Sequence, residues 1–118
     1  MKQVSIYDKM TRSEREVAEL LKNLGIRWSY EHPVFVWDEN KRPRVWTPDF
    51  YLFNFGIYVE VCGSEKFNYE YREKIYRDNN YNVIFLHLYK DPKRWENYLI
   101  NLLKFITLFR YNKLSDVF

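Results

Sequence analysis

A charged helical segment between two strand-like runs is the feature that most constrains the fold of this chain. Residues 66–80 (KFNYEYREKIYRDNN) have helical spacing. The run before them, residues 56–63, alternates as a strand does, and the run after them, residues 81–89 (YNVIFLHLY), is almost entirely apolar. A helix between two strands can act as a crossover that makes them parallel, and a continuous apolar strand is typical of one covered on both faces. The expected buried stripe of the helix is Phe67, Tyr71 and Ile75.

An earlier helix is expected in MTRSEREVAELLKNLGI. Ser13 and Glu16 fit a capping box, and Thr11 and Glu14 offer a second register of the same signal. Gly25 stands where a glycine commonly ends a helix. The sequence therefore predicts a first helix that begins near one of these two caps.

The remaining segments predict two more strands and a last helix. Residues 26–37 favour an extended strand, interrupted or bent at Pro33, and residues 45–53 favour another, with a charged turn between them. Asp91 and Pro92 fit the start of the last helix. Its apolar positions are Trp95, Leu99, Leu102, Ile106 and Phe109. The order α-β-β-β-α-β-α predicts an α/β fold, with a mixed sheet flanked by helices.

Composition limits the class of protein. The chain has 118 residues, 47% of them apolar, which suits one domain over residues 1–118 with a real core. Its single cysteine, Cys62, excludes an internal disulfide and favours a reducing, cytoplasmic setting. We expect no secretory signal and no membrane span, because the N-terminus lacks an apolar stretch and the longest apolar run is short and contains a lysine.

Basic residues gather in three places, although the net charge is only +3. These clusters are either solvated surface or, together with many tyrosines, a groove that follows a sugar–phosphate backbone. Their members are Lys41, Arg42 and Arg44; Arg72, Lys74 and Arg77; and Lys90, Lys93 and Arg94.

Two carboxylates stand on consecutive predicted strands. Asp49 is expected on one face of its strand with Thr47 and Tyr51, and Glu60 lies between two valines in the next strand. A carboxylate in the middle of a central strand is costly to bury unless it is paired or bound to a metal. Two such acids provide hard oxygen ligands suited to Mg²⁺ or Mn²⁺, and metal-assisted phosphodiester cleavage uses such a site.

The motif Pro48-Asp49, followed by Glu60-Val61-Cys62 on the next strand, resembles the PD-(D/E)XK nuclease superfamily. The resemblance spans roughly residues 11–90 and implies a restriction-endonuclease-like αβββαβ core with an added C-terminal helix. It also implies a Mg²⁺-dependent DNA endonuclease, in which Asp49, Glu60 and the Val61 carbonyl hold the metal and Glu16 supports it as a ligand.

The chain departs from this family at Cys62, where the family normally has a lysine. A thiol supplies no fixed positive charge at neutral pH. In one explanation a cation comes from the neighbouring helix, with Lys74 acting on the water and Arg72 on the phosphate. In the other, the domain has lost catalysis and is a DNA-binding or assembly module.

Plainer interpretations stand beside these roles. Glu16 could serve only as the capping partner of Ser13, Asp49 could be a turn residue, and Glu60 could form a structural ion pair. Lys74 could pair with a glutamate on its own helix. The two histidines are too few and too far apart for a zinc site.

DNA contacts and dimerisation complete the expectations. The DNA-binding residues that the sequence suggests are Arg72, Lys66, Lys41, Arg42, Arg44, Tyr69 and Tyr76. The last helix is apolar on several sides, so it either packs deeply on the sheet or forms a homodimer interface. A symmetric dimer would suit a structure-selective Holliday junction resolvase, which is the alternative enzyme of the same fold.

Overall fold

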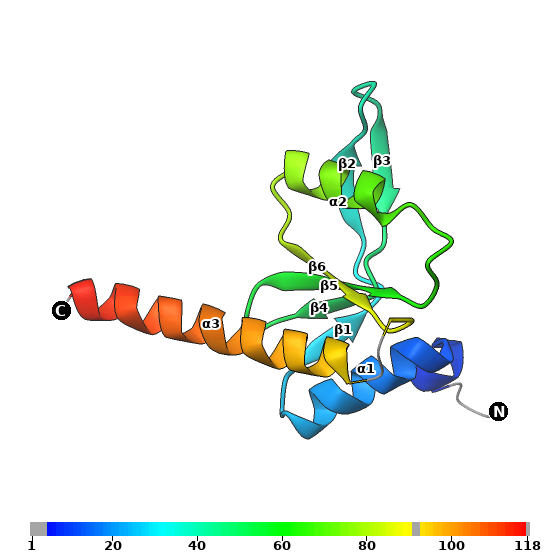
Figure 1. Ribbon diagram of the computed structural model, residues 1–118. Helices are drawn as coiled ribbons and strands as arrows, with labels where there is room; N and C mark the ends of the chain where they lie inside the picture. Colours follow the sequence, from blue (N-terminus) through cyan, green and yellow to red (C-terminus); the bar gives the residue numbers. More distant parts are fainter. Residues whose placement is uncertain (1–4, 91–92, 118) are drawn as a thin grey trace.

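Three helices surround a four-stranded sheet, and a two-stranded hairpin stands apart from it (Figure 1). This computed structural model describes residues 5–90 and 93–117. The elements in chain order are a short 3₁₀ helix η1 (Ile6–Lys9), α1 (Arg12–Asn23), β1 (Trp28–Tyr30), β2 (Val34–Trp37), β3 (Pro43–Trp46), β4 (Phe50–Leu52), β5 (Ile57–Cys62), α2 (Tyr69–Asp78), β6 (Val83–His87) and α3 (Arg94–Val117).

The main sheet has the strand order β1-β4-β5-β6. The β1–β4 and β4–β5 pairs are antiparallel, and β5 and β6 are parallel. The helix between β5 and β6 is therefore a crossover, as the sequence predicts, and the fold is α/β with a mixed sheet.

The two faces of the sheet carry different layers. On the first face, α1 and α3 cover the larger core, which includes Val17 and Leu21 of α1, Phe50 and Val59 of the sheet, and Leu99 of α3. On the second face, α2 and the β2–β3 hairpin enclose a smaller core formed by Val34, Val36, Ile75 and Tyr76. Figure 1 shows these layers on opposite sides of the sheet. The alternation of β5 explains the division, because its successive side chains point to opposite faces.

The strand predicted over residues 26–37 is interrupted before Val34, as expected near Pro33, but its two parts lie in different sheets. It divides into β1, which joins the main sheet, and β2, which pairs with β3 in the separate hairpin. The chain turns at Glu31, whose φ is 56°, just before Pro33. The strand predicted over residues 45–53 also divides, because β3 ends at Trp46 and β4 begins only at Phe50. Pro48 lies between them, and a proline has no N–H to give to a strand ladder.

Of the two caps predicted for the first helix, only one forms. Thr11, not Ser13, caps α1: its hydroxyl accepts from the Glu14 N–H, and the Glu14 carboxylate accepts from the Thr11 N–H. Gly25 has a φ of 70° just after the C-cap, as expected for the glycine that ends a helix. Asp91 and Pro92 lie outside the described residues.

The buried stripe predicted for α2 is wrong. Phe67 precedes the helix and is 70% exposed, and Tyr71 is 41% exposed, whereas Ile75 and Tyr76 are buried. Phe67 lies outside the helix, and the buried face runs through Ile75 and the adjacent Tyr76, so of the predicted stripe only Ile75 is confirmed.

The fully buried residues of α3 lie in its first half, and Arg110 in the second half donates to the carbonyls of Asn54 and Phe55. Trp95, Leu99 and Leu103 are buried in the larger core, whereas Phe105 and Phe109 are exposed. Figure 1 shows the second half of α3 extending past the sheet. Within the described residues, no helix is both long enough and apolar enough to cross a membrane.

Candidate functional site

Asp49 and Glu60 meet at one end of the main sheet. β4 and β5 are antiparallel with Phe50 opposite Val59, so one further step of the register brings Asp49 opposite Glu60. Asp49 Oδ2 accepts a hydrogen bond from the Val61 N–H at 2.7 Å. Asp49 lies just before β4, so its side chain accepts from β5 where the strand ladder has not yet begun. The bond fixes the Asp49 carboxylate against β5.

Val61 contributes backbone atoms on the same side. The N–H of Tyr58 and the carbonyl of Cys62 bond toward β6, so the even-numbered residues of β5 use that side. In a parallel ladder the odd-numbered residues then present their N–H and C=O groups to the other side. The Val61 carbonyl therefore lies on the edge of β5 where Asp49 is bound.

Glu14 is the third carboxylate of the site. The supporting acid expected from the sequence was Glu16. Glu16 is exposed and lies 3.9 Å from Arg12 in an ion pair on the surface of α1, whereas Glu14 is only 7% exposed. One Glu14 oxygen accepts from the Thr11 N–H and the other accepts from the Tyr30 hydroxyl at 2.8 Å. The Thr11–Glu14 capping register is the sequence signal that points to Glu14. No local sequence pattern identifies Tyr30 as a partner of Glu14, because Tyr30 lies in β1, distant from α1 in the sequence.

The close approach of α1 to the sheet depends on a glycine. A Cβ added to Gly63, just after β5, would lie 3.3 Å from the Ser13 Oγ in the first turn of α1. This absence of a side chain lets the start of the helix approach the end of the strand. A cavity of about 420 Å³ opens there, and its lining includes Glu14, Asp49, Val61, Ser64 and Tyr69.

Burial raises the pKa of both strand acids, Asp49 and Glu60. Burial raises the pKa of Asp49 to about 7, against the hydrogen bond from Val61, and the negative charges of Glu60 and Glu14 add to the rise. Burial also raises the pKa of Glu60, while Arg72 and Tyr76 oppose that rise. A nearby cation therefore stabilises the ionised form of these two carboxylates.

Arg72 is the cation that reaches Glu60. Its Nη2 lies 3.4 Å from Glu60 Oε1, and the Tyr76 hydroxyl donates to the same oxygen at 3.2 Å. The guanidinium also lies 4.7 Å from the centre of the Trp46 ring, an arrangement that favours a cation. The Arg72 Nε is buried and has no hydrogen-bond partner within the described residues. Arg72 thus retains a donor for a further acceptor.

Lys74 and Cys62 do not take the position of the missing lysine. Lys74 is exposed on α2. Cys62 is fully buried, and burial raises the pKa of its thiol to about 12. Of the two helix residues suggested by the sequence, the structure brings Arg72 to the acids and leaves Lys74 in solvent.

The suggested DNA-contacting residues are spread over several elements. Lys41 and Arg42 are exposed in the turn of the β2–β3 hairpin, and Lys66 is exposed before α2. Arg44 lies 3.1 Å from Asp38, so part of its charge is compensated. Tyr69 is partly buried and donates to the Ser64 carbonyl at 2.8 Å. Tyr76 was also suggested as a DNA-binding residue, but it is 1% exposed and its hydroxyl donates to Glu60.

Two oxygen-bearing side chains and a carbonyl suit Mg²⁺ or Mn²⁺, which often bind through one or two carboxylates together with the phosphate of the substrate. Within residues 5–90 and 93–117, no three His, Cys, Asp or Glu side chains form a ready-made metal cluster. The donors that fit are therefore Asp49, Glu60 and the Val61 carbonyl. Glu14 lies beside them with both oxygens already hydrogen-bonded.

Comparisons of the chain with protein-family models, with curated proteins and with solved structures found no match.

Proposed function

We propose that this protein is a metal-dependent DNA endonuclease that hydrolyses phosphodiester bonds. One observation carries the proposal: Glu14, Asp49 and Glu60, from α1, the start of β4 and β5, converge at one end of the sheet, with a cavity beside Glu14 and Asp49. Buried acids with a raised pKa, such as Asp49 and Glu60, are more common at functional sites than elsewhere. A divalent cation relieves their repulsion.

The order of elements supports a PD-(D/E)XK-like, restriction-endonuclease-like core. With the β2–β3 hairpin set aside as an insertion, the order is α1-β1-β4-β5-α2-β6, which is the αβββαβ order implied by the resemblance. Asp49 and Glu60 then occupy the second and third strands of that core. This agreement between motif and strand position is stronger support than the short motif alone.

Asp49, Glu60 and the Val61 carbonyl would hold Mg²⁺ or Mn²⁺, and Glu14 replaces Glu16 as the supporting acid. When bound, the metal neutralises charge on a phosphodiester and makes a water molecule more acidic. The Val61 N–H holds Asp49 in one orientation, and Tyr76 and Arg72 do the same for Glu60. These contacts reduce the reorganisation that substrate binding requires.

Arg72 replaces the motif lysine in this proposal. A guanidinium can form paired hydrogen bonds to a phosphate, and the Arg72 side chain beside Glu60 keeps 34% of its surface exposed. Arg72 therefore binds and orients the phosphate, and Lys74 takes no part. The exposed Lys41 and Arg42 of the hairpin, and Lys66 beside α2, attract the backbone of the DNA over a longer range.

A second candidate is a catalytically silent DNA-binding or assembly module. The observation that favours it is the pairing of Glu60 with Arg72, which already compensates one of the two acids. The buried Cys62 at the lysine position points the same way. A Holliday junction resolvase of the same fold is a variant of the first proposal and requires a dimer.

The test is nicking of supercoiled plasmid in the presence of Mg²⁺ or Mn²⁺. We expect cleavage by the wild-type protein and none by Asp49→Ala or Glu60→Ala, with Glu16→Ala as the matched surface control. Cleavage that persists in both site variants would reject the site. Wild-type protein that binds DNA but never cleaves it, and binds no Mn²⁺ in calorimetry, would favour the silent module.

A further inference from the structure

β6 forms one edge of the main sheet. It pairs with β5 on one side, and within the described residues no strand pairs with its other side. The Asn82 carbonyl accepts from the N–H of Tyr58 in β5, so the even-numbered residues of β6 bond toward β5. The N–H and C=O groups of Val83 and Phe85 therefore point outward. An unpaired strand edge of this kind is a template for another strand.

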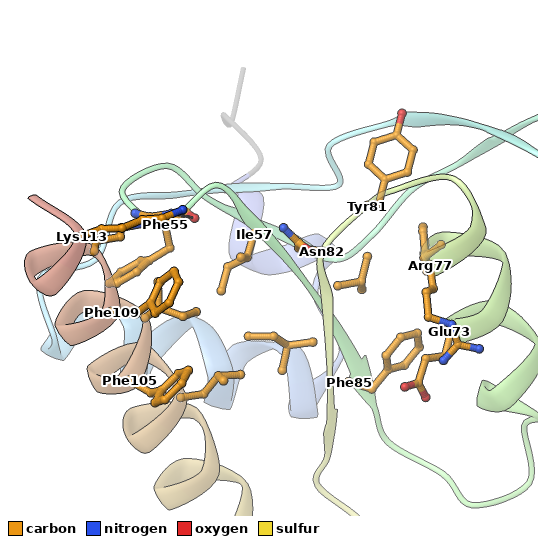
Figure 2. Close-up of a pocket in the computed structure, with 16 residues that line it drawn as sticks. Phe55, Ile57, Glu73, Arg77, Tyr81, Asn82, Phe85, Phe105, Phe109 and Lys113 are labelled. Carbon is orange, nitrogen blue, oxygen red and sulfur yellow. Dashed lines mark hydrogen bonds between the residues drawn. The ribbon is translucent and has the colours of Figure 1, made fainter. Parts of the chain in front are cut away.

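This open edge lies along a groove between α2 and α3. Two cavities, of about 650 and 370 Å³, share Val83 and Phe85 of β6 and Leu102 of α3 in their linings. We call the joint lining of the two cavities the edge groove, and its middle consists of these three residues and Phe105. Figure 2 shows β6 between the two helices, with Phe105 on the α3 side and Arg77 on the α2 side.

The middle of the edge groove is apolar. Val83 and Phe85 are half-buried, and Phe105 is 65% exposed. β6 (VIFLH) has no proline, lysine or acidic residue that would keep another strand away. An apolar patch beside an unpaired edge is typical of a surface that another polypeptide covers.

The edge groove is also basic. Among the described residues that line it, Glu73 is the only acid, against five cations: Arg77, Lys90, Arg94, Arg110 and Lys113. None of the five forms an ion pair within the part of the chain described. Arg110 donates to two backbone carbonyls, which are neutral, so its charge is not cancelled. Charge complementarity therefore calls for an anionic occupant.

The cations stand at both ends of the apolar middle. Lys90 and Arg94 line only the smaller cavity, past the C-terminal end of β6. Arg77 and Lys113 line only the larger cavity, which also includes Tyr81 just before β6. An occupant that matches this groove has an apolar centre with acidic groups on either side.

The open backbone distinguishes a polypeptide from a nucleic acid. Phosphate and sugar oxygens of a nucleic-acid backbone accept hydrogen bonds, so they offer no donors to the outward carbonyls of Val83 and Phe85. Covering a carbonyl without giving it a donor is costly. A polypeptide strand presents N–H and C=O groups in alternation and satisfies both kinds of group on the edge.

We propose that the edge groove binds an extended, acidic segment of a partner protein, which adds to the four-stranded sheet as a fifth strand beside β6. Apolar side chains at alternate positions of the segment cover Val83, Phe85 and Phe105, and aspartates or glutamates at its two ends face the cations. Main-chain hydrogen bonds provide affinity, and the side chains and charges provide specificity. The inference rests on the sheet edge and does not depend on nuclease activity.

The first test is fluorescence anisotropy with synthetic peptides and the full chain. The probe alternates valine and threonine in its centre and has two aspartates at each end. It should bind, and the same peptide with lysines in place of the aspartates should bind at least about tenfold more weakly. Methylation of the alternate backbone nitrogens that face β6 should also abolish binding. Failure of the acidic peptide to bind, or equal binding of the basic one, would overturn the proposal.

Charge reversal in the protein locates the binding surface. Arg77→Glu and Lys113→Glu should each weaken binding of the acidic peptide about tenfold. Lys74→Glu is the matched control, because Lys74 is an exposed cation of α2 that lines neither cavity. All three side chains are exposed, so the variants are expected to fold, and circular dichroism checks this. A peptide that binds all three variants equally well would contradict the assignment to the edge groove.

Amide hydrogen exchange tests whether the peptide pairs as a strand. The Val83 and Phe85 amides should become protected when the acidic peptide is added, whereas the Ile84 amide faces β5 and should be protected from the start. Unchanged exchange at Val83 and Phe85 in the bound protein would exclude strand addition.

Two other occupants of the groove give different results, and either would replace the acidic segment. Single-stranded DNA, tested as a fluorescent oligothymidine, would bind in place of the acidic peptide and lose affinity in Arg77→Glu and Lys113→Glu. A second copy of this chain would appear in sedimentation velocity as a dimer that excludes the peptide.

Discussion

Arg72 reaches from α2 to place its Nη2 3.4 Å from Oε1 of Glu60. Burial tends to lower the pKa of Arg72, but Glu60 and Tyr76 raise it, so the guanidinium stays charged. The position that carries a lysine in the resembled family holds the buried Cys62 in this chain. A positive charge has thus been supplied to the same acid from a neighbouring helix. The contact between Arg72 and Glu60 has a different meaning in each candidate function. In the endonuclease Arg72 assists Glu60 at the site, and in the catalytically silent module it only neutralises the charge of Glu60.

Replacing Arg72 should separate these roles. In the endonuclease, Arg72→Ala should lower the cleavage rate by about 100-fold, the usual effect of losing one group that stabilises developing charge. Arg72→Lys should recover part of the rate, because it keeps the charge but not the paired hydrogen bonds. The measurement is plasmid nicking under single-turnover conditions.

Lys74→Ala is the matched control for Arg72, because Lys74 is an exposed cation on the same helix. It should leave the rate close to that of the wild type. Loss of cleavage in Lys74→Ala together with an active Arg72→Ala would show that Lys74, not Arg72, is the cation that assists cleavage.

Replacing Glu14 and replacing Glu16, both in α1, should have sharply different effects. Glu14→Gln should reduce cleavage and weaken Mn²⁺ binding, because Glu14 is buried beside Asp49. Glu16→Gln should change neither, since Glu16 pairs with Arg12 at the surface, where such pairs contribute little. Calorimetric titration with Mn²⁺ and the nicking assay measure both effects. Equal behaviour of the two variants would remove Glu14 from the site.

The prediction of local structure succeeded where neighbouring residues determine it. The crossover helix, the parallel β5–β6 pair and Gly25 at the end of α1 follow from periodicity and glycine geometry. The choice between the Ser13–Glu16 and Thr11–Glu14 caps could not be made from spacing, because both fit the capping pattern. Packing of the helix start against Gly63 accompanies the Thr11 cap, and that contact is between distant parts of the chain.

The separate hairpin and the position of Arg72 could not be predicted from the sequence for a similar reason. Residues 26–37 were predicted as a strand interrupted or bent at Pro33, and nothing local shows that its two parts, β1 and β2, join different sheets. The stacking of Arg72 on Trp46 depends on that hairpin folding over α2. The sequence could suggest Arg72 as a cation on the neighbouring helix, whereas its contact with Glu60 required the tertiary fold.

Asp49 predicts an unusual pH dependence of stability in the metal-free protein. Its pKa is about 7 in the folded state, against an ordinary value of 3.8. Between these values the folded state holds a proton that the unfolded chain has released, so the free energy of unfolding should fall as pH rises. The slope is at most about 1.4 kcal/mol per pH unit, and the fall should end near pH 7. Urea denaturation at pH 5, 6, 7 and 8 with a chelator measures this change.

Asp49→Asn is the control for that slope. The amide oxygen can still accept from the Val61 N–H but does not ionise, so the variant should lose most of the decline and exceed the wild type in stability at pH 8. Mg²⁺ or Mn²⁺ should stabilise the wild type at pH 8 by mass action and stabilise Asp49→Asn less. A wild-type stability that rises between pH 5 and pH 7 in step with the variant would contradict the assignment.

Cys62 should be chemically inert in the folded protein. The thiol is fully buried, and burial, together with Glu60 and Asp49, raises its pKa to about 12, so almost no thiolate is present at neutral pH. A thiol-reactive dye should therefore label it slowly in buffer and rapidly in urea. Cys62→Ala should leave plasmid cleavage unchanged, because the proposed mechanism uses a water molecule and three acids, not a sulfur nucleophile. Rapid labelling of the folded protein, joined to loss of cleavage in Cys62→Ala, would place the thiol in the reaction instead of Arg72 and the acids.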